Sequence, residues 1–541
     1  MNIFIGGAWP YANGSLHLGH ISALIPGDIL ARYHRLKGDT VCYISGSDCH
    51  GTPIQVRAKK ENTSPEAVSD FYHHEFKSNF DALGFSYDYY GKTTADYHKQ
   101  FVTDYISQIL ESPYLYRKKI ENVFCKSCNQ FLPDRFIIGT CPMCGKEAKG
   151  DQCEYCGNLL DDLNLENKKC ILCGQTPISR DSEHLYISFS KLEPSIKSYL
   201  SKAHGWRKNA NDISSQYIKA GLRDRAITRD THWGVEVPLW GFKHKRIYVW
   251  VEALLGYLST SKEWLNTQSI DPETFWSADA AAKHYYVHGK DNIPFHTIIL
   301  PALLMINGNY HLPDVIVSSE HLKLEGHKMS TNNDHLVWIP QMLKHYDPDT
   351  IRYFLIINGP EKRDADFSWL EFINSHNGEL IGAFGNFINR NIRFIEKNFG
   401  GIVPAGALSP DIQNEIKHLY ATTGYAIEKN EFKQALEDIF AFIRSGNKYF
   451  DQRKPWETLK SDPQHCQDTI FTCLQMIANL TILLEPFLPF SAEKLRRAFS
   501  IEVSEWKPLS VKAGLKLQAL PVLFTRIEHD DNSALNDASP L

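Results

Sequence analysis

The stretch that decides the fold is IFIGGAWPYANGSLHLGH, residues 3–20. Its first three residues form a short apolar run that ends in Gly-Gly, which is typical of a buried strand entering a turn. Ser15 then precedes apolar residues at helical spacing, so we expect a helix with Ser15 as its N-cap. That helix should end at Gly38, and residues 40–44 predict the next strand. The stretch therefore predicts a strand–helix–strand unit with parallel strands and a ligand site beyond their carboxyl ends.

His17 and His20 fall in the first turn of that helix, three residues apart, and therefore on one face. Orphan backbone N–H groups and the positive end of the helix dipole favour anions there. Two imidazole donors at the same place suit a phosphate whose charge rises during a reaction. On the residues alone, two packed or surface histidines are the alternative. No G-x-G-x-x-G follows the first strand, so a dinucleotide-binding fingerprint is excluded.

Ordered motifs continue from this stretch to residue 456. They are PYANG (10–14), HLGH (17–20), GTP (51–53), GKDN (289–292), KMS (328–330) and PW (455–456). HLGH resembles the HIGH signature of class I aminoacyl-tRNA synthetases, and the whole series resembles the methionyl-tRNA synthetase family in particular. The resemblance covers nearly the whole chain. It implies activation of L-methionine with ATP and transfer of the methionyl group to tRNA(Met) with a CAU anticodon.

The resemblance and the apolar pattern together predict an α/β chain in five segments. We expect a doubly wound Rossmann-type catalytic domain in two halves (1–114 and 229–324), interrupted by a connective insertion with zinc knuckles (115–228). A KMSKS-like loop and stem-contact region (325–365) and an all-α anticodon-binding domain (366–541) follow. In the second half we expect the sheet to resume at 226–230 and 233–238. Residues 247–257 should start as a strand and continue as a helix, with later strands at 284–287 and 315–317.

Composition sets further limits on the 541 residues, of which 43% are hydrophobic. The net charge of −5 gives no overall basic field, so RNA would have to bind at local patches. No apolar run is long enough to span a bilayer, and no charged leader precedes residue 3, so we expect a cytoplasmic protein that does not contact membranes. The chain ends in a polar tail (530–541) without the extra C-terminal domain of some relatives, and we expect a monomer.

Eight of the twelve cysteines form four C-x-x-C pairs, each followed by Asn or Gly. Those residues tolerate the left-handed backbone of a tight thiolate knuckle. In a reducing compartment the pattern favours metal over disulfides, and two pairs complete one tetrahedral thiolate site, so we expect two structural zinc ions. Redox dithiols are the alternative. The resemblance implies that the middle two pairs share one ion and the outer two the other. The pairs are Cys125/Cys128, Cys141/Cys144, Cys153/Cys156 and Cys170/Cys173.

The amino-acid site is expected beside the N-terminal loop. By resemblance Asp48 binds the α-ammonium group and Arg229 supports the active site, whereas a loop cap is the alternative for Asp48. Trp250, Ala253 and Tyr257 lie at helical spacing and predict one pocket wall, with core packing as the alternative. A polarizable thioether fits such aromatic walls. The implied substrate-binding set is Ala8, Trp9, Tyr11, Asp48, Arg229, Trp250, Ala253, Tyr257 and His296.

The ATP site is expected to contain residues from both ends of the catalytic domain. The resemblance assigns catalysis to His17, His20 and Lys328, and Mg²⁺ arrives with ATP rather than in a protein cage. Thr331 stands where the family often has a second lysine, and loss of one donor can cost ~10²–10³ in rate. Adenylation should therefore be slow unless the histidines and Mg²⁺ compensate. The implied ATP-binding set is His17, His20, Gly289, Asp291, Lys328 and Thr331.

Two other functions stay open. One is a non-catalytic tRNA-binding paralogue, which the altered loop at residues 331–333 favours. The other is an amino-acid-adenylating paralogue that ignores tRNA. The second of these is opposed by Asn386, Arg390 and Trp456. Asn386 and Arg390 lie four residues apart on one helix face, and Pro455-Trp456 opens a later segment. RNA bases in loops stack on aromatic rings and are read at their edges. By resemblance Trp456 is the platform and Asn386 and Arg390 are the edge readers, whereas a packed indole at a helix start is the alternative.

Overall fold

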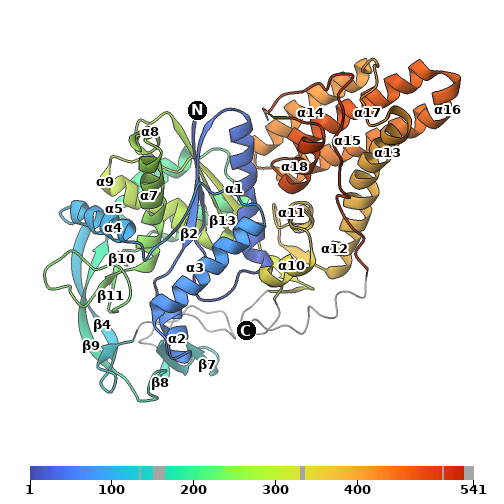
Figure 1. The fold of residues 1–541 in the computed structure, drawn as a ribbon. Helices are drawn as coiled ribbons and strands as arrows, with labels where there is room; N and C mark the ends of the chain where they lie inside the picture. The colour runs from blue at the N-terminus through green and yellow to red at the C-terminus, as the bar shows by residue number, and fades with distance from the viewer. Residues whose placement is uncertain (133–135, 150–164, 329–335, 503–504, 529–541) are drawn as a thin grey trace.

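The structure is a computed structural model, and it describes residues 1–132, 136–149, 165–328, 336–502 and 505–528. Its centre is a sheet of five parallel strands in the order β14–β13–β1–β2–β3 (Figure 1). Along the chain, the sheet grows from β1 to β2 and β3 on one side, and later from β13 to β14 on the other side of β1. The carboxyl ends of β1 and β13 therefore form the switch point where such sheets bind ligands. The predicted doubly wound architecture is confirmed. The strands are β1 (Asn2–Gly7), β2 (Thr40–Ser47), β3 (Tyr89–Lys92), β13 (Ala282–Gly289) and β14 (Val315–Ser319).

Helices cover both faces of the sheet because neighbouring residues of β1 point to opposite sides. Ile3 and Ile5 belong to one core with side chains of α1 (Leu18–Leu36) and α3 (Pro65–Ala82). Phe4 belongs to a second core. That second core includes side chains of α4 (Asp96–Ile109), α7 (Val249–Thr267), α8 (Glu273–Trp276) and α9 (Leu300–Asn307).

The first helix begins with a different N-cap from the one that the sequence predicts. His17 caps α1, and its Nδ1 accepts a hydrogen bond from the Gly19 backbone N–H (3.1 Å). The His20 Nδ1 accepts one from the His17 backbone N–H (3.2 Å). Ser15 instead donates its hydroxyl to Glu75 in α3 (3.2 Å). The prediction of Ser15 was wrong because imidazole nitrogens replace the hydroxyl and carboxyl groups that usually form this capping arrangement.

The chain leaves the sheet after α4 and forms an inserted segment. Its main element is a long antiparallel ribbon in which β4 (Leu115–Cys125) pairs with β9 (Ile178–Ile187). β5 and β10 extend that ribbon, and β7, β6 and β8 form a small separate sheet. Two helices then lead back toward the catalytic domain. The remaining elements are β5 (Gln130–Phe131), β6 (Ile137–Thr140), β7 (Glu147–Lys149), β8 (Glu166–Cys170), α5 (Phe189–Ser201), α6 (Lys208–Ala220) and β10 (Arg225–Ala226).

The prediction that the main sheet resumes at residues 226–238 is wrong. β10 joins the sheet of the insertion, and β11 (Thr228–Arg229) pairs with β12 (Arg246–Ile247) in a separate ribbon. Residues 235–237 alternate buried and exposed like a strand, but Gly234 has a φ of +144° and Pro238 follows, so ladder pairing is limited to an isolated bridge between Glu236 and Arg246. The main sheet resumes only at β13.

The C-terminal half is mainly helical and joins the catalytic domain through buried polar contacts. The Arg352 side chain, fully buried in α11 (Pro348–Ile357), donates to Asp28 of α1 (2.7 Å) and to the Phe487 carbonyl (2.9 Å). No helix of the described residues is both long and apolar enough to cross a membrane. The other elements are β15 (Leu322–Leu324), β16 (His327–Lys328), α10 (Ile339–His345), β17 (Ala365–Phe367), α12 (Trp369–Ser375), η4 (His376–Gly385), α13 (Asn386–Phe399), α14 (Pro410–Glu428), α15 (Phe432–Arg453), α16 (Pro455–Ser461), α17 (Pro463–Leu483) and α18 (Pro489–Ala498).

Candidate functional site

A carboxylate cluster lies at the carboxyl end of β2. Asp48 is tied to the N-terminal loop because its backbone N–H donates to the Pro10 carbonyl and its carbonyl accepts from the Ala12 N–H (2.9 Å each). The Asp48 side chain is 1% exposed, and burial together with the nearby Glu252 carboxylate raises its pKa. Glu252 pairs with the His50 Nδ1 (2.7 Å). Two buried carboxylates in one place favour a bound cation, as the predicted ammonium role of Asp48 requires.

An aromatic wall stands beside that cluster. Trp250 of α7 stacks on Phe295 with ring centroids 4.2 Å apart, and Tyr11 meets Trp250 edge to face at 5.5 Å. Trp9 contacts Tyr257 at 6.4 Å. The structure thus brings together predicted residues that lie far apart in the sequence. Phe295 was not predicted to be part of the site, although it directly precedes His296, which was.

The protonation of His296 follows from its partners. Its Nδ1 lies 2.9 Å from the Asn292 carbonyl, which only accepts, so Nδ1 carries the hydrogen. Burial lowers the pKa of His296 to about 4, so the ring is neutral at pH 7 and its Nε2 accepts from the Tyr257 hydroxyl (2.8 Å). This pair gives the aromatic wall a fixed polar point.

The start of α1, from its N-cap His17 to His20 in its first turn, presents two neutral imidazoles. Both Nδ1 atoms accept backbone N–H groups, so the hydrogen of each neutral ring is on Nε2. Burial lowers the pKa of His17 well below its usual value, with a further contribution from His20, and burial lowers that of His20 to about 4. The ring centroids are 3.9 Å apart. The two rings therefore offer two N–H donors at the positive end of a helix, which suits a polyphosphate.

The chain that follows Lys328 returns to the start of α1. β15 follows the carboxyl end of β14, and β16 pairs with β15 through Lys323 and Lys328. Nine residues after Lys328, the Val337 carbonyl accepts from the Leu18 N–H (3.1 Å). The backbone thus brings both ends of the predicted lysine loop to the ligand-binding edge of the sheet. Thr331 lies outside the described residues.

Gly289 and Asp291 lie at the end of β13, at the switch point. Apart from its two chain neighbours, no described residue has an atom within 4 Å of the position where a Cβ on Gly289 would stand, so the backbone there is open to close approach by a ligand. The Asp291 carboxylate pairs with the His321 ring (3.0 Å). Lys290, which was not predicted, binds Glu320 (2.8 Å) and Asp364 (2.6 Å) and so links this loop to the segment before α12.

Two further predicted residues border the site. The Ala8 N–H continues the pairing of β1 by donating to the Val287 carbonyl (2.9 Å). The Arg229 guanidinium lies over the Tyr248 ring at 3.8 Å and donates to the Thr228 carbonyl (3.0 Å). Arg229 lines a narrow cavity together with His50 and Glu252, the ion pair next to Asp48.

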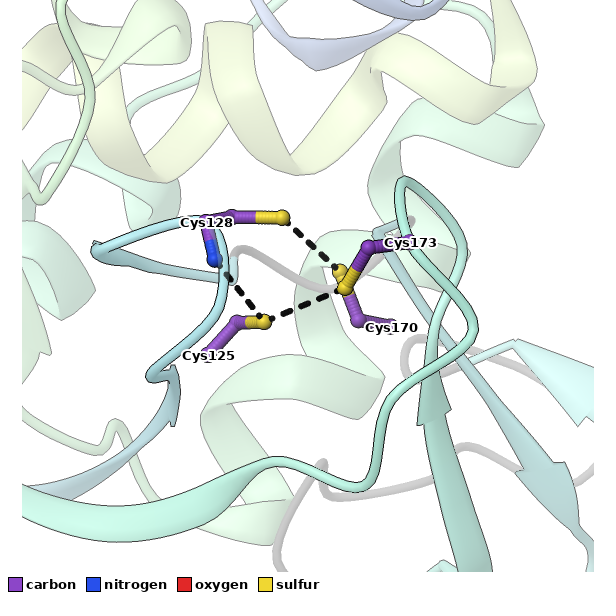
Figure 2. Close-up of side chains that lie close together, drawn as sticks. All are labelled: Cys125, Cys128, Cys170 and Cys173. Atoms are coloured by element: carbon purple, nitrogen blue, oxygen red, sulfur yellow. Dashed lines mark hydrogen bonds between the residues drawn. The ribbon is translucent and has the colours of Figure 1, made fainter.

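Four cysteines of the insertion converge on one point (Figure 2). The Cys125 and Cys173 sulfurs are 3.5 Å apart and those of Cys128 and Cys170 are 3.9 Å apart. Sulfurs at ~2.3 Å from a tetrahedral zinc ion would be ~3.8 Å from one another, so the group fits zinc. The outer two pairs thus come together as the resemblance implied.

The turns of the knuckles have the predicted backbone. Asn129 has a φ of 51° and Gly174 of 74°, both left-handed. Cys141 begins a turn with the same hydrogen bond as Cys170, because the Gly145 N–H donates to the Cys141 carbonyl (2.9 Å) as the Gly174 N–H does to Cys170 (2.8 Å). Cys144 follows in that turn. Cys153 and Cys156 lie outside the described residues.

The predicted edge readers and platform all contact neighbouring residues of α15. Asn386 and Arg390 lie on α13, where the Asn386 amide donates to Asn447 (3.1 Å) and the Arg390 guanidinium lies 4.1 Å from the Phe450 ring. Trp456 also packs on Phe450, with centroids 5.9 Å apart, yet is 48% exposed. Pro455 begins α16, as predicted, and is buried. An exposed indole beside amide and guanidinium groups is suited to unpaired bases.

Comparison with known proteins agrees with these features. Residues 3–392 match the family of class I tRNA synthetases (M), and residues 403–538 match the anticodon binding domain of methionyl tRNA ligase. Methionine–tRNA ligase 1 of Alkaliphilus oremlandii is 50% identical over 529 residues, 98% of each chain. Methionine–tRNA ligase of Bacillus cereus (strain 03BB102) is 50% identical over 531 residues, 98% of this chain and 97% of the relative.

Solved structures share the fold. Mycobacterium tuberculosis methionyl-tRNA synthetase bound by methionyl-adenylate superposes with a TM-score of 0.79 at 21% identity, over 96% of this chain and 99% of that one. Its apo form superposes with a TM-score of 0.74. From the family match over most of its length and from half-identical relatives of equal extent, we conclude that the chain belongs to the methionyl-tRNA synthetase family, ligases of the class I aminoacyl-tRNA synthetases.

Proposed function

We propose that the chain activates L-methionine with ATP and transfers the methionyl group to tRNA(Met). The methionine carboxylate attacks the α-phosphate of ATP, which gives methionyl-adenylate and pyrophosphate. A hydroxyl of the terminal ribose of tRNA then attacks the methionyl carbonyl, and AMP leaves. One observation supports this most strongly: the imidazole pair, the buried carboxylates and the aromatic wall lie at the same end of one parallel sheet.

Methionine binds with its ammonium group at Asp48. Its thioether lies against the aromatic wall. There the hydrogen bond between Tyr257 and His296 fixes one polar point, and the small side chain of Ala253 leaves space for the methionine side chain. Close backbone approaches support the placement of Trp9, because a Cβ on Gly46 would lie 2.7 Å and one on Gly256 would lie 2.9 Å from the Trp9 ring. A pocket of this kind distinguishes one methylene by only ~1–3 kcal/mol, so selectivity rests on the fit as a whole.

ATP binds across the switch point. The Nε2–H groups of His17 and His20 donate to the triphosphate and Lys328 supplies a positive charge, while the Gly289–Asp291 turn receives the adenosine. Thr331 contributes a hydroxyl where relatives often have a second lysine. Magnesium enters with ATP and supplies charge neutralisation on the phosphates. Chemistry of this type needs positioning and electrostatic stabilisation rather than a covalent intermediate.

The helical domain reads the CAU anticodon. A splayed base stacks on Trp456, and Asn386 and Arg390 hydrogen-bond base edges after exchanging their present partners on α15. Pro455 fixes the start of α16 and hence the position of the indole. We propose that the enzyme acts as a monomer, in the cytoplasm, where its tRNA and ATP substrates are found.

A pyrophosphate-exchange assay tests the proposed function. Label should enter ATP only with methionine among the twenty amino acids, and purified tRNA(Met) should then accept methionine. Exchange with a different amino acid would assign another substrate. Exchange without charging would indicate an adenylating paralogue, and absence of both would indicate a tRNA-binding protein that has lost its chemistry.

Zinc content tests the metal proposal. We propose two zinc ions per chain, both structural, because all four ligands of each are thiolates and no open position remains for substrate. Elemental analysis of metal-replete protein should give about two equivalents, and Cys170→Ser should leave about one. Cys466→Ser, which changes a buried cysteine of α17 outside the insertion, is the control and should retain both. Wild-type protein without zinc would contradict the proposal.

A further inference from the structure

A second lysine stands directly across the ribbon from Lys328. The antiparallel register of β15 and β16 pairs Lys323 with Lys328 and Leu324 with His327. Residues that are paired in this way are neighbours across a ribbon. Two lysine positions are therefore adjacent at the ligand-binding edge of the sheet, and the proposed function gives a role only to Lys328.

The side chain of Lys323 points away from the hydrophobic core. Its neighbours Leu322 and Leu324 are 5% and 7% exposed and belong to the same core as the buried side chains of α1. Because side chains alternate along a strand, Lys323 lies on the other face of β15, and it is 40% exposed. A ligand can therefore reach its ammonium group.

The ion pair of Lys323 is shared with another lysine. The Lys323 Nζ lies 3.4 Å from the carboxylate of Asp364, the residue directly before β17. The Lys290 Nζ is nearer to that carboxylate, at 2.6 Å, and its hydrogen bond is the largest cause that lowers the pKa of Asp364. Lys290 can therefore neutralise Asp364 without Lys323. Partly exposed ion pairs are weak, so Lys323 can leave Asp364 for a more highly charged ligand at little cost.

The ribbon joins the two ends of the proposed ATP site. At one end, Asp364 lies between Lys323 and Lys290, which belongs to the turn that is proposed to receive adenosine. At the other end, the chain returns to the imidazole pair, because the Val337 carbonyl accepts from the Leu18 N–H at the start of α1. A triphosphate that extends from adenosine to the imidazoles therefore runs past this ribbon.

The sequence after the ribbon lacks a positive charge. Thr331 stands where relatives often have a second lysine, so the segment KMST (328–331) carries only one cation. Negative charge rises on the phosphates during adenylation, and loss of one donor at such a place costs ~10²–10³ in rate. A lysine on β15 supplies a cation from outside that segment.

We propose that Lys323 binds the triphosphate of ATP beside Lys328 and supplies the positive charge that Thr331 lacks. The inference rests on the proposed function, because it adds a residue to the ATP site of that reaction. When ATP binds, Lys323 exchanges the Asp364 carboxylate for phosphate oxygens. Lys290 keeps Asp364 neutralised, so the adenosine turn stays anchored during the exchange.

Lys323→Met tests the proposal, because the change keeps an unbranched side chain and removes its charge. In pyrophosphate exchange the kcat/KM for ATP should fall at least about tenfold, since loss of one transition-state donor costs ~10²–10³ and Lys328 remains. The KM for methionine should not change. Lys262→Met is the matched control, because Lys262 of α7 is also partly exposed and paired with a carboxylate, that of Glu273 (2.9 Å). The control should exchange like wild type, and wild-type kinetics in Lys323→Met would overturn the inference.

Inhibition by adenosine separates a contact with the phosphates from an effect through Asp364. Adenosine competes with ATP but has no phosphates, so its inhibition constant should be the same for wild type and for Lys323→Met. Equal weakening of adenosine and ATP would overturn the inference, because Lys323 would then act only by holding Asp364 and the adenosine turn in place.

A lysine at the position that relatives use gives a rescue test. Thr331→Lys, added to Lys323→Met, should restore most of the lost exchange, because it returns a cation to the triphosphate. A loss that Thr331→Lys does not restore would overturn the inference and leave the proposed function intact. Wild-type protein without methionine-dependent exchange would instead count against the proposed function.

Discussion

Replacement of His20 by alanine is expected to slow methionine-dependent exchange of pyrophosphate into ATP by about 10²–10³-fold. The His20 ring is neutral with its hydrogen on Nε2, so it can donate to a phosphoryl oxygen without an earlier proton transfer. Such a donor matters most when charge on that oxygen rises in the transition state. We therefore expect the loss in kcat, with a smaller change in the KM for ATP.

A matched histidine variant separates this effect from general damage. His74→Ala changes an exposed histidine of α3 and should exchange at the wild-type rate. The melting temperature of His20→Ala should lie near that of wild type, because its Nδ1 satisfies only one backbone N–H of the helix start. A His20→Ala enzyme with the wild-type exchange rate would show that the imidazole pair does not contact the triphosphate.

Acidification from pH 7.5 to pH 5 is expected to reduce the free energy of unfolding by about 2 kcal/mol for each of three buried histidines. Burial is the largest cause of each shift: it lowers the pKa of His98 and His284 to about 3 and that of His296 to about 4. In the unfolded chain a histidine has a pKa of about 6.5. These rings therefore stay neutral in the folded protein and take up protons on unfolding.

The free energy of unfolding falls as the pH falls, because the unfolded chain binds more protons than the folded protein. The stabilisation is complete above pH 6.5, falls as the pH drops below that value, and is lost once the pH reaches the folded pKa near 3 to 4. Asp48 works in the opposite direction, because burial and Glu252 raise its pKa and protonation relieves that cost. The three histidines together contribute about 6 kcal/mol, which is comparable with the whole stability of many domains.

Calorimetry at the two pH values measures the effect. The first unfolding transition should shift downward by more than about 10 °C at pH 5. The His284 ring faces the Phe275 carbonyl (2.9 Å), which a glutamine amide can also serve, so His284→Gln should lose about 2 kcal/mol less than wild type on acidification. Unfolding that does not change between pH 7.5 and pH 5 would contradict the prediction.

Local patterns predicted the elements around the switch point because each has a clear apolar run or a clear helical spacing of apolar residues. The apolar run 3–5, the helical spacing after residue 17 and the strands at 284–287 and 315–317 all appear in the structure at or near the predicted bounds. Prediction failed at residues 226–238, where alternation indicates a strand but Gly234 and Pro238 limit its pairing. It also missed β3, whose four residues are too short to give a clear period.

The sequence by itself determined the chemistry available to this protein: imidazoles at a helix start, thiolate knuckles, and an indole after a proline. It did so because each of these depends on residue type and short spacing alone. Only the tertiary structure decided which of them meet. Cys125 and Cys173 lie 48 residues apart, and the β4–β9 ribbon brings their sulfurs to 3.5 Å. Such contacts depend on strand register and on how the insertion packs on the sheet, and these are set by burial summed over the whole chain rather than by any local pattern.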